Sequence, residues 1–322
     1  MSMFLVGAAM TAAGPALVSY GRRRGEHDEE NSRYLSIGYS LAICGPFLLL
    51  AFLLTFPAAL LVAFAVCGAF WLTDMVSLWR RNVRLTKGAA AYVSDVFVLV
   101  CCICLIRFFV VDIFVVPSSS MRPTLSVGDV MLADKFSYGV RLPILNQTIL
   151  PVGSPRPGDV MVFSWPIHPR ETFVKRVIGA PGDEITLNGK TLLVNGAPVL
   201  HTPTGSIAYE GDEGGQIRAD RFSERLPWPF DMGSHSVLYR NDRPWLDVDS
   251  FNDFHPAKGC SLSGQTLHCV VPSNEYFVLG DNRDDSLDSR YWGFVPDSDI
   301  LGKVDAVLFN QHDWRRYFLK IQ

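Results

Sequence analysis

Three consecutive serines, Ser118, Ser119 and Ser120, follow an apolar run and lie between two prolines in the segment PSSSMRPTL. A serine hydroxyl is a weak nucleophile at neutral pH, and it attacks a carbonyl carbon only when a nearby base removes its proton. The first question that this sequence raises is therefore which side chain acts as that base.

Histidine is the usual base for a serine, but the seven histidines of this chain all lie in polar or loop-like surroundings. None of them belongs to a recognisable acidic motif. The members of a serine–histidine–aspartate triad meet only in space, however, and need no shared sequence signature. A histidine base therefore stays open, although a surface position is expected for each histidine.

Lys175 is the other candidate base, because it lies inside the apolar segment TFVKRVIG, which is typical of a β-strand. In a strand, Phe173, Lys175 and Val177 share one face, whereas Val174 and Arg176 share the other. An amine on an apolar face loses hydration, which lowers its pKa, and a neutral amine can take a proton from a serine. The competing interpretation is a lysine on an edge strand that points into water.

A third polar segment, GDNRDDSLDSRYWGFVP, begins at Gly280 and mixes acids with arginines. Calcium loops place acids at alternate positions without arginines between them, so this segment does not predict a calcium site. Pairing of Asp281 with Arg283 and of Asp288 with Arg290 is expected instead, in a rigid turn. The spacing of cysteines and histidines does not indicate zinc either, and no metal is expected.

The front third of the chain is apolar and is expected to cross a membrane. Residues 34–54 and 56–79 each reach the length that a spanning helix needs, about 20 residues. A third span is expected from 96 to about 116, and the weaker run 3–20 is a fourth span, an interfacial segment or a signal-like segment. Lysines and arginines flank the 34–79 pair on both sides, which predicts that both flanks are cytoplasmic. The third helix then delivers the serines to the outer face.

The remainder of the chain is expected to form one β-rich domain, because short apolar runs alternate with turn residues. The Asn-Gly pairs at Asn188 and Asn195 predict hairpins. Residues 200–265 are polar, glycine-rich and irregular, and an insertion or subdomain is expected there. No helical period is sustained after residue 125 outside the last dozen residues, where a helix is left open. The expected organisation is thus a membrane anchor at 1–116 and a β domain at 117–322.

Charge and cysteine content narrow the function further. The net charge is −3 and no basic patch runs along the β-rich part, so nucleic-acid binding is not expected. Five of the seven cysteines lie in apolar runs, whereas Cys260 and Cys269 bracket the short segment SLSGQTLH. A disulfide between these two residues is expected, and it would place the domain outside the cytoplasm.

The three polar segments resemble the conserved boxes of the bacterial type I signal peptidases, in the order of that family and after an N-terminal membrane anchor. PSSSMRPTL at 117–125 matches the serine box, KRVIGAPGD at 175–183 the lysine box, and GDNRDDSLDSR at 280–290 the third box. The likeness covers about 117–183 and 272–305. It implies a membrane-anchored, mostly β fold with an antiparallel β-sheet catalytic domain, and it implies no cofactor.

The resemblance also implies roles for individual residues. Ser120 is the expected nucleophile and Lys175 the general base, while Ser118 helps to stabilise the oxyanion and Ser286 orients the lysine. The residues expected to support the site structurally are Asp281, Arg283, Asp288 and Arg290. The residues expected to line shallow pockets for small substrate residues at positions −1 and −3 are Phe114, Val116, Phe173 and Val174.

Three positions depart from the common pattern of the family. Ser119 replaces a glycine, Asp285 replaces a frequent asparagine and adds a negative charge, and Leu287 replaces a small residue. None of these changes removes a catalytic group, but Leu287 is expected to narrow or reshape a neighbouring subsite.

The function implied is a membrane-bound serine endopeptidase that cleaves N-terminal signal peptides from exported preproteins. Its partners would be those preproteins and the lipid bilayer, at the outer side of the bacterial cytoplasmic membrane. One alternative is a specialised Ser/Lys peptidase of a conjugation or pilus system. Another is a non-catalytic membrane scaffold that binds peptides, although such a scaffold has no need for the serines and the lysine as a set.

Overall fold

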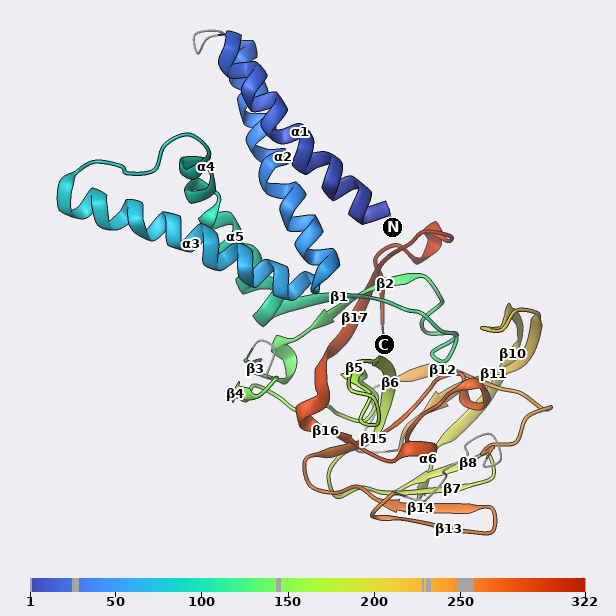
Figure 1. Cartoon of the computed structure of the whole chain (residues 1–322). Helices are drawn as coiled ribbons and strands as arrows, with labels where there is room; N and C mark the ends of the chain where they lie inside the picture. Colours follow the sequence, from blue (N-terminus) through green and yellow to red (C-terminus); the bar gives the residue numbers. More distant parts are fainter. Residues whose placement is uncertain are drawn as a thin grey trace. The chain divides into compact units, whose positions relative to one another are not determined.

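The computed structural model describes residues 2–24, 29–142, 146–227, 229, 233–247 and 257–321. The chain divides into two compact units, Met1–Arg107 and Phe108–Gln322 (Figure 1). The described part of the first unit is helical, whereas the second unit consists mostly of β-strands.

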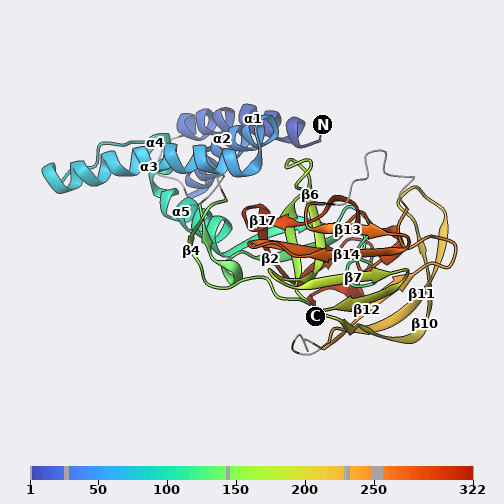
Figure 2. The same cartoon turned by 90° about the horizontal axis from the view of Figure 1, so that it is seen from below.

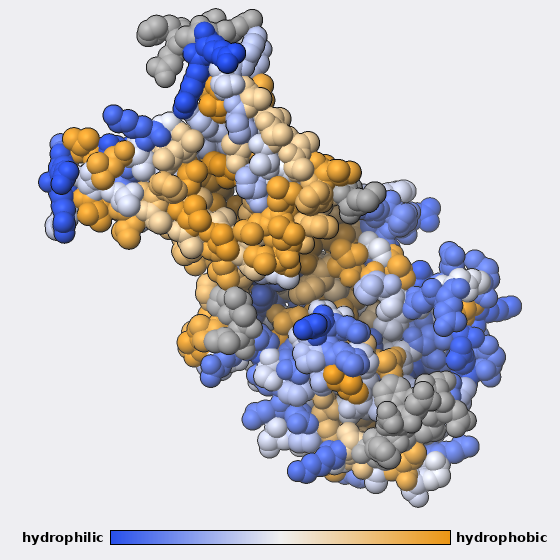
Figure 3. Space-filling model, in the orientation of Figure 1, coloured by the Kyte–Doolittle hydropathy of each residue, from blue (hydrophilic) through white to orange (hydrophobic). Residues whose placement is uncertain are grey.

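The helical unit has the composition of a membrane anchor. Its helices are α1 (Ser2–Arg24), α2 (Glu29–Leu53), α3 (Phe56–Arg81), α4 (Ala89–Asp95) and α5 (Phe97–Leu105). Among the described residues, four helical segments are long and apolar enough to cross a membrane: Met3–Arg23, Arg33–Leu53, Phe56–Arg81 and Ala89–Val110. Figure 3 shows apolar side chains over most of the visible face of this unit, with hydrophilic ones gathered at the ends of its helices.

The weak first run, 3–20, forms a helix that lies very close to α2. A Cβ added at Gly14 would lie 2.5 Å from the backbone of Ala42, and one added at Gly45 would lie 2.5 Å from the backbone of Thr11. Glycine is therefore required at both positions for the two backbones to approach, as is common between membrane helices. The run is a complete helix of spanning length rather than a short segment.

The last apolar helix differs from the expected third span, 96 to about 116. It runs over Ala89–Val110, and the residues that follow it, Val111–Val115, form the strand β1. β1 pairs along its whole length with β2 (Asp129–Asp134) in antiparallel register. The apolar helix therefore begins and ends earlier than expected, and it ends earlier because the sheet takes up the last residues of the apolar run. The boundary expected at residue 116 likewise falls inside the second unit.

The largest sheet of the second unit contains part of the lysine box in one of its strands. The serine box and the third box each follow another strand of this sheet. Its eight strands are arranged in the order β1-β2-β17-β5-β6-β15-β16, and β18 pairs with β17. Besides β1 and β2, its strands are β5 (Val160–Ser164), β6 (Thr172–Gly179), β15 (Glu275–Leu279), β16 (Val295–Pro296), β17 (Ile300–Asn310) and β18 (Leu319–Lys320). All of these pairings are antiparallel. β6 lies in the interior of the sheet, whereas β1 forms an edge.

One of the smaller sheets confirms both hairpins that the Asn-Gly pairs predict. A five-stranded sheet contains β7 (Glu184–Asn188), β8 (Thr191–Val194), β9 (Ala197–Pro198), β13 (Cys260–Ser263) and β14 (Thr266–Val270). Asn188 pairs with Thr191 across the first turn, where Gly189 has a positive φ of 56°. In addition, β3 (Val140–Arg141) pairs with β4 (Thr148–Leu150).

The described part of the segment 200–265 is not irregular, contrary to expectation, whereas the insertion or subdomain expected there stays a prediction. The segment contains the three-stranded sheet of β10 (Leu200–Glu210), β11 (Gln216–Arg225) and β12 (Ser234–Tyr239), and Figure 2 shows the long hairpin β10–β11 at one side of the β unit. Most residues of β10 are exposed, and for this reason no alternation of apolar and polar residues marks the strand. Residues 228, 230–232 and 248–256 of the segment lie outside the described part of the chain.

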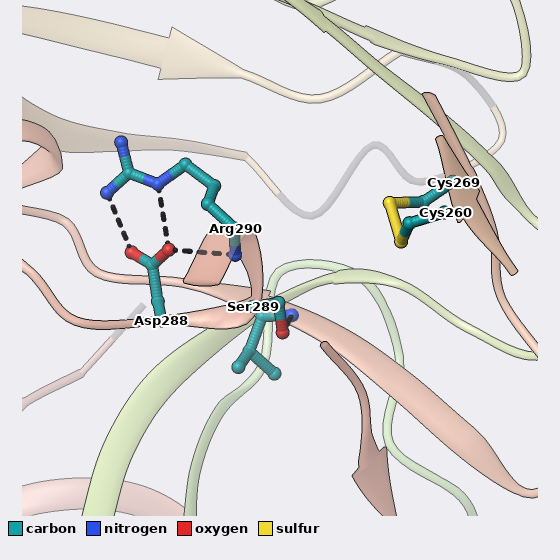
Figure 4. The surroundings of a disulfide bond; sticks show 6 residues. Cys260, Cys269, Asp288, Ser289 and Arg290 are labelled. Carbon is teal, nitrogen blue, oxygen red and sulfur yellow. Dashed lines mark hydrogen bonds and ion pairs between the residues drawn. A yellow bond between two sulfur atoms is a disulfide. The ribbon is translucent and has the colours of Figure 1, made fainter. Parts of the chain in front are cut away.

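The end of the chain also differs from expectation. The last dozen residues form no α-helix in their described part, since Trp314–Arg316 is a short 3₁₀ turn and β18 follows it. Cys260 and Cys269 are cross-strand neighbours on β13 and β14 and are joined by a disulfide (Figure 4).

Candidate active site

Lys175 and Ser120 meet in the interior of the second unit. Lys175 lies on β6, between β5 and β15, and only 4% of its surface is exposed. Its Nζ donates a hydrogen bond of 2.9 Å to Ser120 Oγ and one of 3.1 Å to the carbonyl oxygen of Val174. The competing interpretation of a lysine on an edge strand is therefore wrong.

Burial makes the amine a weaker proton binder than an ordinary lysine. Loss of hydration lowers the pKa of Lys175 from 10.5 to about 8, while the carboxylates of Asp288 and Asp281 oppose this shift and Arg290 adds to it. About one-tenth of such amines are neutral at pH 7, and a neutral amine can accept the proton of the adjacent hydroxyl.

The serine box is a tight turn whose apolar residues anchor it in the core. Met121 and Leu125 are buried in one cluster with Val116 and Val174. Because these buried side chains anchor the turn in the core, the hydroxyl of Ser120 is held toward β6. In this turn, Ser118 Oγ lies 3.3 Å from Ser120 Oγ, within hydrogen-bond distance.

Ser286 lies close to the site, but its hydroxyl makes no hydrogen bond to the lysine in this structure. Its Oγ is buried and has no hydrogen-bond partner among the described residues. The hydroxyl lies against Gly280, where any side chain would collide with it. The same glycine also allows the carbonyl oxygen of Ser120 to approach, since a Cβ there would lie 2.6 Å from that oxygen.

One of the two expected ion pairs in the third box forms. Arg290 Nε lies 2.8 Å from Asp288 Oδ1, and Figure 4 shows the two side chains in a paired arrangement. Asp288 also accepts a hydrogen bond of 3.0 Å from the backbone N–H of Gly280. This carboxylate therefore ties the turn together, which is the structural role expected of it.

The expected pair of Asp281 with Arg283 is wrong. Asp281 instead accepts two hydrogen bonds from Arg176, of 2.9 and 2.8 Å, and a third from Thr124 of the serine box. Arg283 donates to Glu224, at 2.6 Å, and to the carbonyl oxygen of Gly280, at 3.0 Å. The reason is the register of the sheet, because Arg176 stands opposite Leu279, two residues before Asp281.

A cavity of about 470 Å³ opens beside the two hydroxyls and the amine. The four residues that were expected to contact substrate all line it: Phe114, Val116, Phe173 and Val174. Two extended segments form its walls, the end of β1 with Pro117 and the beginning of β6. Leu287 also lines the cavity.

No histidine lines this cavity in the described part of the chain, which favours the lysine as the base. His201 and His235 lie elsewhere, with their Nε2 atoms 2.6 and 3.0 Å from the buried carboxylate of Glu224. Across the residues that the structure describes, no cluster of three histidine, cysteine or acidic side chains is arranged to hold a metal ion.

Sequence reasoning missed Asp212, which also lines the cavity. Its carboxylate accepts a hydrogen bond of 2.9 Å from the backbone N–H of Ser119, in the middle of the serine box. Asp212 belongs to the turn between β10 and β11, whose sequence GDEGG is typical of a solvated loop. The sequence therefore carries no signal that this residue lies near the serines.

Comparison with known proteins agrees with this geometry. The family model described as "Signal peptidase, peptidase S26" matches residues 89–309. Signal peptidase I of Pseudomonas aeruginosa is 33% identical over 293 residues, which cover 81% of this chain and 94% of that protein. Signal peptidase I of Pseudomonas fluorescens is 34% identical over 286 residues, which cover 79% of this chain and 92% of that protein.

A solved structure of a signal peptidase I from Enterococcus faecalis matches 47% of this chain and 97% of that chain at 23% identity, with a TM-score of 0.24. That score is too low to support an argument about shape. The family model and the two Pseudomonas proteins, by contrast, extend over most of the chain. The chain therefore belongs to the signal peptidase family, peptidase S26, and is a serine endopeptidase of that family.

Proposed function

We propose that this protein cleaves N-terminal signal peptides from exported preproteins, with Ser120 as the nucleophile and Lys175 as the general base. The observation that carries the proposal is the 2.9 Å hydrogen bond between a buried amine of lowered pKa and a serine hydroxyl that lines the cavity. A protein that only bound peptides would have no use for a lysine held in this state.

The reaction follows from the positions of these groups. Neutral Lys175 accepts the proton of Ser120 while Oγ attacks the carbonyl carbon of the scissile peptide bond. The hydroxyl of Ser118 and the backbone N–H of Ser120 stabilise the oxyanion that forms, and each such donor typically contributes a few kcal/mol. The protonated lysine then gives its proton to the departing amine, which leaves with the mature protein.

The acyl-enzyme that remains holds the signal peptide as an ester on Ser120. A water molecule gives a proton to Lys175 and attacks the ester carbonyl, which releases the signal peptide and restores the serine. Ser286 is proposed to orient the lysine during these steps, because its buried hydroxyl lacks another partner among the described residues.

The cavity supports a preference for small residues at positions −1 and −3 of the substrate. An extended peptide can lie between the end of β1, whose outer edge is unpaired in the sheet, and the beginning of β6. The apolar walls then accept small side chains and exclude large ones by overpacking. Leu287 is proposed to make one of these subsites narrower.

The proposed location is the bacterial cytoplasmic membrane, with several spans and with the β unit on the outer side. Four candidate spans alternate with loops, and the basic residues at 22–24 and 80–87 then both face the cytoplasm. An even number of spans puts the start of the chain on the same side as the β unit. The disulfide between Cys260 and Cys269 supports an oxidising compartment for that unit.

The proposal is tested by incubating the full-length protein in detergent with a purified precursor and sequencing the new N-terminus. Cleavage after a small residue by the wild-type protein, and none by Ser120→Ala, is the expected result. Absence of cleavage by the wild-type protein would refute the proposal. A panel of unrelated precursors separates a general signal peptidase, which the comparisons favour, from an enzyme dedicated to one conjugation or pilus substrate.

A further inference from the structure

The hairpin β10–β11 reaches the serine box at two points. From one side, the carboxylate of Asp212 accepts hydrogen bonds of 2.9 and 3.2 Å from the backbone N–H of Ser119. From the other side, the carbonyl oxygen of Ser119 accepts a hydrogen bond of 3.2 Å from Asn282 Nδ2. That same amide nitrogen donates to the hydroxyl of Tyr209 at 2.8 Å. Both polar backbone groups of Ser119 are thus tied, directly or through one residue, to this hairpin.

Ser119 is the residue through which such a restraint acts on the chemistry. It stands between Ser118 and Ser120, so that a rotation of its backbone moves both hydroxyls. The hydroxyls lie 3.3 Å apart, and one of them accepts the hydrogen bond from Lys175. A displacement of about 1 Å in such a group is enough to cost on the order of 100-fold in rate.

Further hydrogen bonds hold the hydroxyl of Tyr209 in place. The hydroxyl of Tyr209 donates to Asp285 at 2.6 Å, and Arg240 of the same three-stranded sheet region donates to that carboxylate at 2.9 Å. Burial, together with the nearby carboxylate of Asp285, raises the pKa of Tyr209, so its hydroxyl keeps its proton and stays a donor. The aspartate that replaces a common asparagine at position 285 thus anchors the tyrosine.

The Asp212 side depends on the shape of the hairpin tip. Gly214 and Gly215 have positive φ values of 83° and 91°, and Gly214 N donates to the carbonyl oxygen of Gly211 at 3.0 Å. These glycines allow the chain to turn tightly enough to direct Asp212 back toward the serines. Because the tip is exposed, its acidic side chains can be changed without disturbing the core.

We propose that Asp212 and Tyr209 are positioning residues, which hold the backbone of Ser119 so that Ser118 and Ser120 face the base. This inference rests on the proposed peptidase reaction. It gives the three-stranded sheet of β10, β11 and β12 a function in the reaction, namely to support the nucleophile turn from outside the three boxes.

The test compares Asp212→Ala, Asp212→Asn and Tyr209→Phe in the full-length protein, with Glu210→Gln as the matched control. Glu210 is an exposed acid of the same hairpin and does not line the cavity. Asp212→Ala removes both the acceptor and the charge, and we expect kcat on a precursor to fall by about 10-fold or more with little change in KM. Tyr209→Phe is expected to lower kcat less, and Glu210→Gln to leave it unchanged.

Asp212→Asn distinguishes the effect of the hydrogen bond to Ser119 from the effect of the negative charge. The amide oxygen of the asparagine still accepts the hydrogen bond from Ser119, whereas the charge is lost. We expect kcat to be largely retained, and the acid limb of the kcat/KM profile to move to lower pH. The charged groups that act on Lys175 are Asp288, Arg290, Asp281 and Asp212, and only the last is altered. A merely structural contact would not shift that limb.

Two results would overturn the inference: an unchanged kcat in Asp212→Ala, or an equal loss in Glu210→Gln. A double variant of Asp212→Ala with Tyr209→Phe adds a check, because two residues that restrain the backbone of the same residue, Ser119, are expected to have non-additive effects. Full additivity would also count against it. Failure of the wild-type protein to cleave the precursor would instead refute the proposed function, so the two claims can fail separately.

Discussion

Lys175 and Arg176 are neighbours on β6, yet the fold treats their positive charges in opposite ways. Both side chains are buried, with 4% and 1% of their surfaces exposed. The amine of Lys175 has two neutral partners at hydrogen-bond distance, the hydroxyl of Ser120 and a backbone carbonyl. The guanidinium of Arg176, by contrast, is held by the carboxylate of Asp281 through two hydrogen bonds.

Because of this difference, one residue of the strand can act in catalysis while its neighbour stabilises the fold. Without an adjacent carboxylate, burial lowers the pKa of Lys175 to about 8, which makes the amine a usable base. Burial would raise the pKa of Asp281, but the Arg176 guanidinium outweighs it and holds that pKa below its ordinary value. The ion pair of Arg176 with Asp281 thus links the lysine box to the third box, while the lysine is left free to exchange a proton.

The largest effect is expected when the amine of Lys175 is replaced by a permanently charged group, like the one on the arginine face of β6. Lys175→Arg puts a permanent cation beside Ser120, since a guanidinium does not lose its proton in proteins. We expect cleavage of a precursor to fall by roughly 10⁴-fold or more, as with removal of a nucleophile or its base. Ser120→Ala should be as inactive, with a near-native circular dichroism spectrum. Substantial activity in Lys175→Arg would point to another base.

The second effect is on stability and concerns the arginine face. Asp281→Asn leaves the Arg176 charge buried without its carboxylate, which typically costs about 3–5 kcal/mol of unfolding free energy. Denaturant unfolding of the full-length protein in detergent measures this loss. The control is Arg170→Met, an exposed arginine in the loop before β6, for which a change within about 0.5 kcal/mol is expected. Equal effects for the two variants would deny the pair its structural role.

The third effect is a gain of stability on the lysine face that depends on pH. Because the pKa of Lys175 is about 8 in the folded protein and 10.5 ordinarily, the unfolded chain binds this proton more tightly, and burial destabilises the fold below pH 8. The penalty fades as the pH rises through 10.5. Lys175→Met is therefore expected to stabilise the protein at pH 7, by up to roughly 3 kcal/mol, and far less above pH 10. Equal gains at both pH values would contradict a charged origin.

The smallest effect is expected at Ser286. Its hydroxyl makes no hydrogen bond among the described residues of the free protein, so it contributes only if it turns toward the lysine during the reaction. We expect Ser286→Ala to lower kcat by about 10-fold, less than the roughly 10²–10⁴-fold that a general base itself contributes, and to leave the unfolding midpoint unchanged. Unaltered kinetics would restrict Ser286 to filling space beside Gly280.

Much of the site could be predicted from the sequence because its signals are local. The apolar neighbours of Lys175 indicate burial in a strand, and the three serines between prolines indicate a turn. The Asn-Gly pairs fix the β7–β8 hairpin for a similar reason, since the turn itself demands a positive φ. Such features depend on a few adjacent residues and not on the arrangement of the whole fold.

The parts that could not be predicted depend on contacts distant in sequence. Arg176 binds a carboxylate 105 residues away, and Asp212 contacts a backbone group 93 residues away. The nearest arginine in the sequence, Arg283, was the natural partner for Asp281, but the register of β6 and β15 brings Arg176 closer. The strands of the 200–265 segment could not be predicted, because most of β10 faces solvent and its sequence shows no apolar period.

The assignment of Lys175 as the general base depends on its lowered pKa, and that pKa can be measured directly. Full-length protein labelled with ¹³C at the lysine Cε carbons is titrated in detergent, and Lys175→Arg identifies the resonance of this residue. One resonance is expected to titrate near pH 8 and to be absent from the variant. If every lysine resonance titrates near pH 10.5, the buried amine is charged at neutral pH and the assignment of Lys175 as the general base is contradicted.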